Sequence, residues 1–400
     1  MPKNIFTGEI EHLFHILDGG EDRLRLVGGC VRDSIIGRGI VDYDLATKHR
    51  PEELIAILDR HGIEHLDLAR RFGTVTAILN GKKFEITTLR RDVDSDGRHV
   101  VVEFSSDYGE DAGRRDFTFN ALYCDSNLVV HDYFGGITDL KKGLIRFIGN
   151  PEERIVEDHL RILRFFRFYA GYCYSIDHRA LEACRGQRDS IDKLSRERVT
   201  GEMRRILETK YPVKVLRIME RCGILQKLLH YENELDLHGL EIFYSLKNHL
   251  DFRCDYLFVL AAIASKNKIE HNLKLRKSEK IYLDSILDNI PQHMDHFEIE
   301  KLLFRLGNLN VVKAIIMIYL CNNFDRNYGE YLDFLERTRI PKLEITAKDL
   351  AEHGFEDKRE YSRLIEQAKD IFTESGFIYG KKEIMEALID SQKKYYPRKL

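Results

Sequence analysis

The sequence predicts an α+β fold in which an α/β head is followed by a long all-helical region. Residues 1–140 alternate helix and strand patterns, with strands expected at 24–27, 40–46, 73–79, 83–90, 121–124 and 128–132. From about residue 152 the pattern is helical with few prolines, and Asn150-Pro151 is a helix-start signal. We therefore expect an α/β head (1–140), a helical neck (141–205), a helical body (206–285) and a helical tail (286–400).

The composition is that of an ordinary water-soluble globular protein. The 400 residues are 43% hydrophobic and 32% charged, which is enough for more than one core. There is no run of about 18 apolar residues and no signal peptide, so we expect no membrane association and a cytoplasmic location. The seven cysteines show no Cys-x-x-Cys spacing, which argues against a disulfide framework and a zinc site. The oligomeric state stays undetermined.

A strand, a glycine turn and a helix are expected at the start of the head. Residues 24–27 predict the strand, Gly28-Gly29 the turn, and residues 30–36 the helix. Glycine lets a ligand approach the backbone, and the first N–H groups of a helix attract anions, with Arg32 one turn further in. The pattern indicates a phosphate site, although Gly-Gly before a helix is also ordinary turn chemistry.

Two aspartates follow this turn on the next expected strand, residues 40–46. Because strand side chains alternate, Asp42 and Asp44 should point to the same face, close enough to favour a bound cation. Carboxylates with few other ligands suit Mg²⁺, which keeps positions for water and phosphates. Glu85 in the strand 83–90 is either a third acid of this site or a solvated strand residue.

Three further segments carry charge. The Arg-Arg-Asp sequence at 114–116 suits phosphate, because guanidinium groups bind it bidentately, but it equally fits a surface charge cluster. The segment 157–168 contains no helix breaker and predicts a helix on which Asp158 and Arg161 are neighbours. The polar, glycine-containing segment 91–113 is expected to be a loop.

The net charge of −3 does not by itself indicate a nucleic-acid partner, but local basic patches are enough for phosphate contacts. Such patches suggest an RNA track along a helical arm, although each also fits a solvated helix face. The candidate residues are Arg196, Arg198, Arg204, Arg205, Lys274, Arg276, Lys277, Lys280 and the basic run at 393–399.

Five ordered motifs resemble those of the class II tRNA nucleotidyltransferases, the CCA-adding enzymes, which share ancestry with bacterial poly(A) polymerases. They are Leu-Val-Gly-Gly-x-Val-Arg-Asp at 26–33, Asp-x-Asp at 42–44, Arg-Arg-Asp-Phe-Thr-Phe-Asn-Ala-Leu at 114–122, Asp-Tyr-Phe-Gly-Gly at 132–136 and Glu-Asp-His-Leu-Arg at 157–161. The resemblance covers residues 24–205, and the second half of the chain matches only in being helical. It implies a polymerase-β-like nucleotidyltransferase head.

The resemblance also implies roles for individual residues. Asp42 and Asp44 would hold Mg²⁺, and Glu85 is the candidate third catalytic acid. The residues expected to bind the nucleotide are Gly28, Gly29, Arg32, Arg115, Asp116, Asp158, Arg161, Arg164 and Arg167.

In this family interpretation, Asp158 and Arg161 act together as a protein template for the incoming base. Cytosine and adenine each present an amine donor beside an unprotonated ring nitrogen, whereas uracil and guanine show the reverse order. A carboxylate accepts from the amine and a guanidinium donates to the nitrogen, so one pair accepts C and A and leaves U and G with unsatisfied groups.

The expected function is therefore CCA addition to tRNA, with CTP and ATP as substrates and the tail (286–400) expected to bind tRNA. In CCA-adding relatives the region 91–113 is a flexible loop associated with the final adenosine, so its presence favours the full reaction. The alternatives are a poly(A) polymerase, an enzyme that adds only the final A, and a non-catalytic RNA-binding protein. The last would have no reason to keep Asp42, Asp44 and the Gly-Gly turn together.

Overall fold

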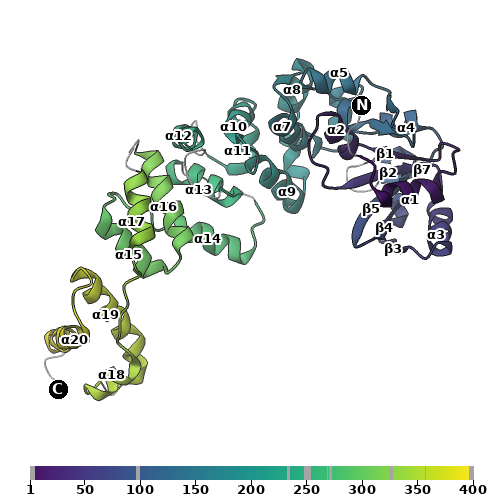
Figure 1. The fold of residues 1–400 in the computed structure, drawn as a ribbon. Helices are drawn as coiled ribbons and strands as arrows, with labels where there is room; N and C mark the ends of the chain where they lie inside the picture. The colour runs from purple at the N-terminus through teal and green to yellow at the C-terminus, as the bar shows by residue number, and fades with distance from the viewer. Residues whose placement is uncertain are drawn as a thin grey trace. The chain divides into compact units, whose positions relative to one another are not determined.

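The structure is a computed structural model that describes residues 5–95, 100–231, 235–246, 254–267, 269, 273–323, 328–355 and 357–395. Its contacts define two units, Met1–Glu234 with Ile269–Lys274, and Leu235–Lys268 with Leu275–Leu400. The first unit contains the mixed sheet and the second is helical, which confirms the α+β class (Figure 1). The expected boundaries at 140, 205 and 285 are finer than this division and stay predictions.

A seven-stranded mixed sheet forms the centre of the head. Its only parallel pair within the described residues is β2–β5, which brings the residues after the glycine turn beside the later strand that carries Glu85. The expected strands are confirmed, except that the second begins at Tyr43 rather than at residue 40, and β3 was missed because it is very short. The strand order is β3 (Glu64–Leu66), β4 (Thr74–Leu79), β5 (Lys82–Thr88), β2 (Tyr43–Thr47), β1 (Leu24–Val27), β8 (Leu122–Cys124) and β9 (Val130–Asp132).

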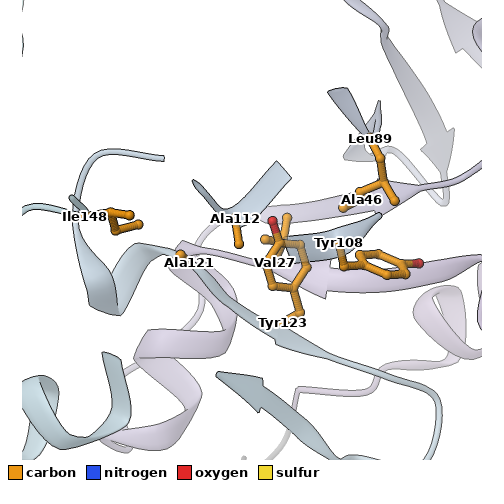
Figure 2. Close-up of a cluster of buried hydrophobic side chains, with 8 residues drawn as sticks. All are labelled: Val27, Ala46, Leu89, Tyr108, Ala112, Ala121, Tyr123 and Ile148. Carbon is orange, nitrogen blue, oxygen red and sulfur yellow. The ribbon is translucent and has the colours of Figure 1, made fainter. Parts of the chain in front are cut away.

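A buried apolar cluster ties helix α4 (Tyr108–Gly113) to this sheet. Figure 2 shows Val27 of β1 and Tyr123 of β8 packed together with Tyr108 and Ala112 of α4. Burial of these side chains is the main force that fixes α4 on the sheet. The helix leads directly into the Arg-Arg-Asp segment. The other helices of the head are α1 (Gly8–Leu17), α2 (Gly29–Ile35), α3 (Pro51–Arg60) and α5 (Gly136–Lys141), with 3₁₀ turns η1 (Arg70–Phe72) and η2 (Thr118–Asn120).

The segment expected to be a loop, residues 91–113, instead contains regular structure. Strands β6 (Arg90–Ser95) and β7 (Val100–Phe104) pair antiparallel, and α4 follows them. The three consecutive valines at 100–102 supply the β propensity that the polar first half concealed. Residues 96–99, which connect the strands, lie outside the described residues.

The neck begins as expected, but its first helix ends early. Asn150 caps α6 (Pro151–Glu157) by accepting from the Glu152 N–H at 2.9 Å, which confirms the Asn-Pro start. The continuous helix predicted over 157–168 was wrong at residues 158–160. Asp158 is extended, and the helix over the later residues, α7 (Arg161–Tyr172), starts only at Arg161. Asp158 Oδ1 accepts the Leu160 N–H at 3.1 Å, a local turn that competes with helix continuation.

Aromatic packing holds α7 against the Arg-Arg-Asp segment. The Phe117 ring lies 5.4 Å from Phe168 and 4.8 Å from Phe147 between ring centroids, and Phe165 packs on the same group. These contacts place the backbone that carries residues 114–116 beside the polar face of α7. The remaining elements of the first unit are β10 (Leu144–Ile145), β11 (Ser175–Ile176), α8 (His178–Gly186), η3 (Arg188–Lys193), α9 (Arg196–Leu207), α10 (Pro212–Arg221) and α11 (Ile224–Leu229).

The second unit is organised around one buried helix, α16 (Leu309–Asn322), which is packed by α12–α15 and α17 (Figure 1). A separate apolar cluster joins the last three helices, α18 to α20. Among the described residues, none of the helices is both long and apolar enough to cross a membrane. The helices are α12 (His238–Leu246), α13 (Tyr256–Lys266), α14 (Lys277–Leu287), α15 (His296–Leu306), α17 (Tyr328–Arg337), α18 (Ala347–Glu352), α19 (Tyr361–Glu374) and α20 (Lys381–Tyr395), with the 3₁₀ turn η5 (Lys358–Glu360).

Candidate active site

A polar cleft of ≈ 450 Å³ lies in the first unit, where the glycine turn, the Arg-Arg-Asp segment and α7 meet. Every residue that the sequence assigned to nucleotide binding lines it. Of the three expected catalytic acids, Asp44 lines the cleft, whereas Asp42 and Glu85 are not among its lining residues. The lining residues are Gly28, Gly29, Arg32, Asp44, Arg114, Arg115, Asp116, Asn120, Asp158, Arg161, Arg164, Arg167, Phe168 and Tyr172.

Four of these residues were not assigned to the site from the sequence. Arg114 and Asn120 stand inside a motif that was recognised, so their neighbours were the available indication. Phe168 and Tyr172 continue the face of α7 that carries Arg164, at steps of four residues. Following that helical face past Arg164 would have found both aromatic residues.

The glycine turn has the backbone conformation that its residues predict. Gly28 has φ +74°, a conformation that favours glycine, and its N–H donates to the Leu122 carbonyl at 3.0 Å. A Cβ at Gly28 would lie 3.5 Å from Arg115 Nη1 and 3.6 Å from the Asn120 carbonyl oxygen. These are ordinary contacts, so glycine is needed here for its φ angle rather than for space.

Arg32 is held rigidly at one side of the cleft. Its side chain is buried, Nη1 donates to Asn120 Oδ1 at 2.6 Å, and Nη2 donates to the Tyr172 hydroxyl at 2.7 Å. Nε donates to Asp33 at 2.9 Å, and the guanidinium carbon lies 3.9 Å from the centre of the Tyr172 ring. With so many contacts, the cation is preorganised rather than mobile.

A hydrogen-bonded chain continues from Arg32 through Asn120 to Asp116 and Arg164. Asp116 Oδ1 accepts from Asn120 Nδ2 at 3.0 Å, and Asp116 Oδ2 accepts from Arg164 Nε at 2.7 Å. Burial alone would raise the pKa of Asp116, but the charge of Arg164 and the hydrogen bonds from Asn120 and Arg164 together outweigh it and lower that pKa to about 2. Asp116 is therefore a carboxylate at every physiological pH.

Arg161 and Asp158 both reach the cleft but do not pair as helical neighbours. Arg161 Nη1 donates to Glu157 Oε2 at 2.7 Å, and Nη2 donates to the Arg114 carbonyl at 3.0 Å. Asp158 instead accepts from Arg198 Nη2 of α9 at 2.8 Å. The break after Glu157 thus lets the two side chains approach the cleft from different backbone segments, with a separate partner for each.

The acids of the sheet form a crowded negative edge. Asp44 and Glu85 are direct partners in the parallel β2–β5 ladder, and Asp42 lies just before β2, on the exposed side. Burial, then the charges of Glu85 and Asp42, raises the pKa of Asp44. Within the part of the chain that the structure describes, no three His, Cys, Asp or Glu side chains gather closely enough to share a metal ion. A ligand role for Glu85 stays a prediction.

The expected basic track on α9 is largely neutralised by nearby acids. Arg198 pairs with Asp158, Arg204 with Glu208 and Arg205 with Glu202. The basic run at 393–399 lies outside the residues whose side chains are described. An RNA track through these residues stays a prediction.

Two family models match the chain. One is described as "Poly A polymerase head domain" and matches residues 24–146. The other is described as "Probable RNA and SrmB- binding site of polymerase A" and matches residues 173–235. The first covers the seven-stranded sheet with Asp44 and Asp116, and the second covers the segment that follows α7.

Relatives match over nearly the full chain. The zebrafish (Danio rerio) "CCA tRNA nucleotidyltransferase 1, mitochondrial" is 29% identical over 401 residues, which covers 97% of this chain and 92% of that protein. A Streptococcus pyogenes "CCA-adding enzyme" is 43% identical over 232 residues, 56% of each chain. The crystal structure of the Bacillus stearothermophilus CCA-adding enzyme in complex with CTP matches with TM-score 0.76 at 23% identity, covering 98% of this chain and 100% of that one, which shows a shared fold.

The sheet, the glycine turn and the arginine-lined cleft define a polymerase-β-like nucleotidyltransferase head. The chain belongs to the class II family of CCA-adding enzymes and poly(A) polymerases.

Proposed function

We propose that the cleft holds the nucleoside triphosphate while this chain adds C, C and A to the 3′ end of tRNA. The relatives that match nearly the whole chain are named for CCA addition to tRNA. The 3′-hydroxyl of the tRNA attacks the α-phosphate of CTP twice and of ATP once, and pyrophosphate leaves. The observation that carries the assignment of the cleft is that six arginines line a single cavity beside Asp44.

The arginines suit a triphosphate in number and in rigidity. Guanidinium groups bind phosphate oxygens bidentately, and fixed cations stabilise charge without having to reorganise during the reaction. A Cβ at Gly28 would lie 3.5 Å from Arg115 Nη1, and a Cβ at Gly29 would lie 3.7 Å from Arg32 Nη2, so we assign both arginines, with the two glycines, to the triphosphate. Arg164 and Arg167 extend the same positive surface along α7.

Asp42 and Asp44 are proposed to hold Mg²⁺. The donor set fits this ion, because hard carboxylate oxygens are its preferred protein ligands and few of them are needed. The pKa of Asp44 is raised by burial and then by the charges of Glu85 and Asp42, and this repulsion between carboxylates supports a cation at the site. When bound, Mg²⁺ neutralises phosphate charge and activates the attacking hydroxyl. Glu85 is proposed to support the site through its charge beside Asp44.

Asp158 and Arg161 are proposed to select the base. The Asp158 carboxylate accepts from the exocyclic amine, and the Arg161 guanidinium donates to the ring nitrogen, an arrangement that C and A share. Their partners Arg198 and Glu157 fix both groups at the cleft wall before the base arrives. Asp116, joined to Arg164, is assigned to the nucleotide between the phosphates and the base.

A direct assay tests the reaction. The protein is incubated with Mg²⁺ and tRNA transcripts that end before CCA, after C, or after CC, with CTP and ATP supplied separately. We expect C on the first two transcripts and A on the third. Absence of CTP incorporation would refute CCA addition and indicate a poly(A) polymerase or an A-only enzyme instead.

Two substitutions test the site assignments. Asp42→Ala should abolish incorporation of both nucleotides, and surviving activity would remove the metal assignment. Arg161→Ala should increase incorporation of UTP and GTP while the metal requirement stays unchanged. Arg185→Ala is the matched control, because Arg185 is an exposed arginine of the neck that does not line the cleft. Unaltered base choice in Arg161→Ala would overturn the template assignment.

A cytoplasmic location stays a prediction, because the vertebrate relatives are named as mitochondrial. The tail (286–400) is proposed to bind tRNA.

A further inference from the structure

We propose that Asp111 is a positioning residue that orients the adjacent cleft arginines Arg114 and Arg115 toward the triphosphate, together with the Tyr123 hydroxyl. The inference rests on the proposed function, because it takes the cleft as the nucleotide site. Asp111 does not line the cleft; it lies behind the two arginines at the end of α4.

One carboxylate serves both arginines. Asp111 is 1% exposed, and its Oδ1 accepts from Arg114 Nε and Nη2, both at 2.7 Å. Its Oδ2 accepts from Arg115 Nη2 at 3.2 Å and from the Tyr123 hydroxyl at 2.6 Å. The two oxygens of a single buried group therefore fix two neighbouring guanidinium planes.

Tyr123 completes the orientation of Arg115. Its hydroxyl oxygen accepts a hydrogen bond from Arg115 Nε at 3.1 Å, and the same hydroxyl donates a hydrogen bond to Asp111 Oδ2. The ring cannot shift, because it is fully buried in the apolar cluster of Figure 2 and lies edge-on to Tyr108 at 5.6 Å. With Nε and Nη2 engaged behind, Arg115 directs Nη1 toward Gly28, where a Cβ would be 3.5 Å away.

The charge balance of the cluster favours an anion in front of it. Burial raises the pKa of Asp111, but Arg115 and Arg114 outweigh this effect and bring that pKa to about 2. One negative charge thus stands behind two positive ones. Because Asp111 is buried behind the arginines, it neutralises part of their charge without competing with phosphate for the cleft surface.

The first test is Asp111→Asn, which keeps the size of the side chain and removes its charge. A cation displaced by about 1 Å costs on the order of 10²-fold in catalysis, so kcat/KM should fall by about 10²-fold for CTP and ATP alike. The fall should appear in nucleotide binding and turnover, whereas the KM for tRNA should stay unchanged.

Asp139→Asn is the matched control. Asp139 is also buried, accepts from the Thr118 hydroxyl at 2.7 Å and from Arg146 Nε at 3.0 Å, and lies outside the cleft. Both variants should lose thermal stability, but only Asp111→Asn should lose kcat/KM. Equal losses of kcat/KM in the two variants would show a merely structural role and overturn the proposal.

Tyr123→Phe provides a second test that preserves the core. Loss of two hydrogen bonds to charged groups should lower kcat/KM for both nucleotides roughly tenfold. In an Arg115→Lys background, the hydroxyl has no guanidinium Nε to orient, so Tyr123→Phe should then have no further effect on nucleotide KM. An undiminished effect in that background would refute the orienting role, even if Asp111→Asn does not fold.

The outcome separates this inference from the proposed function. If the unaltered protein incorporates neither CTP nor ATP, the proposed function fails. If it incorporates both, and the Asp111→Asn and Tyr123→Phe variants keep their kcat/KM, only the positioning role fails.

Discussion

Replacement of Arg164 by methionine should destabilise the first unit in a pH-dependent way. In the intact protein, Arg164 Nε donates to Asp116 Oδ2 at 2.7 Å, and the Asp116 side chain is buried. Arg164→Met keeps a long side chain but removes its charge, so the Asp116 carboxylate loses its ion pair with α7. The buried charge would then keep only its bonds to Asn120 and to the Phe117 N–H.

The size of the effect follows from the pKa of Asp116. A pKa of about 2 in place of 3.8 corresponds to about 2 kcal/mol of stability at neutral pH. Because the folded-state pKa is depressed, this stability is present above the unfolded pKa and is lost as the pH falls from about 4 to about 2. Breaking a buried pair by removing one partner costs about 3 to 5 kcal/mol, and the remaining hydrogen bonds place this case near the lower limit.

Thermal unfolding followed by circular dichroism or calorimetry between pH 3 and pH 7 measures the effect, since the chain has no tryptophan to report by fluorescence. The difference between the two proteins should be largest at pH 7 and should shrink as Asp116 becomes protonated. The double variant Asp116→Asn with Arg164→Met should recover much of the lost stability. A difference that stays constant with pH, or a double variant that recovers nothing, would refute the reasoning.

Two further predictions concern the contact between Gly136 and η2 and the hydrogen bond that Tyr172 accepts from Arg32. Gly136→Ala should lower stability by about 1 to 3 kcal/mol, because its Cβ would clash with the Thr118 carbonyl oxygen of η2. Gly171→Ala in α7, with nothing within 4 Å, is the control and should not lower the melting temperature. Tyr172→Phe removes the acceptor that holds Arg32 Nη2 at 2.7 Å and should raise the KM of both nucleotides by roughly three- to tenfold, measured by nucleotide titration; an unchanged KM would contradict this.

The glycine turn and the arginines of α7 were predictable from the sequence because their structure is local. Gly28 and Gly29 lie between a buried strand and a short helix, and turn chemistry alone fixes the conformation there. Arg164 and Arg167 lie on a helix whose apolar face is evident from its own residues. For such residues, neighbours in the sequence are also neighbours in space.

The break at Asp158 was not predictable in the same way. No proline or glycine marks it, and aspartate is compatible with both a helix and a turn. The contact that favours the extended form comes from Arg198, which is forty residues later in the sequence and pairs with Asp158 at 2.8 Å. The sequence identified both members of the proposed template but placed them on one helix, because the partner of Asp158 is distant in the sequence.

The acids behind the cleft escaped sequence reasoning for a different reason. Four of the six pairs join residues at most four positions apart, but a local charge pair in the sequence does not show which arginine faces a ligand. Each of the six arginines that line the cleft has a carboxylate partner, and most of these acids do not line it themselves. A cation held from behind presents a fixed charge to its ligand, whereas a free arginine would lose side-chain entropy on binding. The geometry of the site therefore depends on residues that do not contact the nucleotide, and their identity emerges only from the fold. The pairs are Arg32–Asp33, Arg114–Asp111, Arg115–Asp111, Arg161–Glu157, Arg164–Asp116 and Arg167–Glu202.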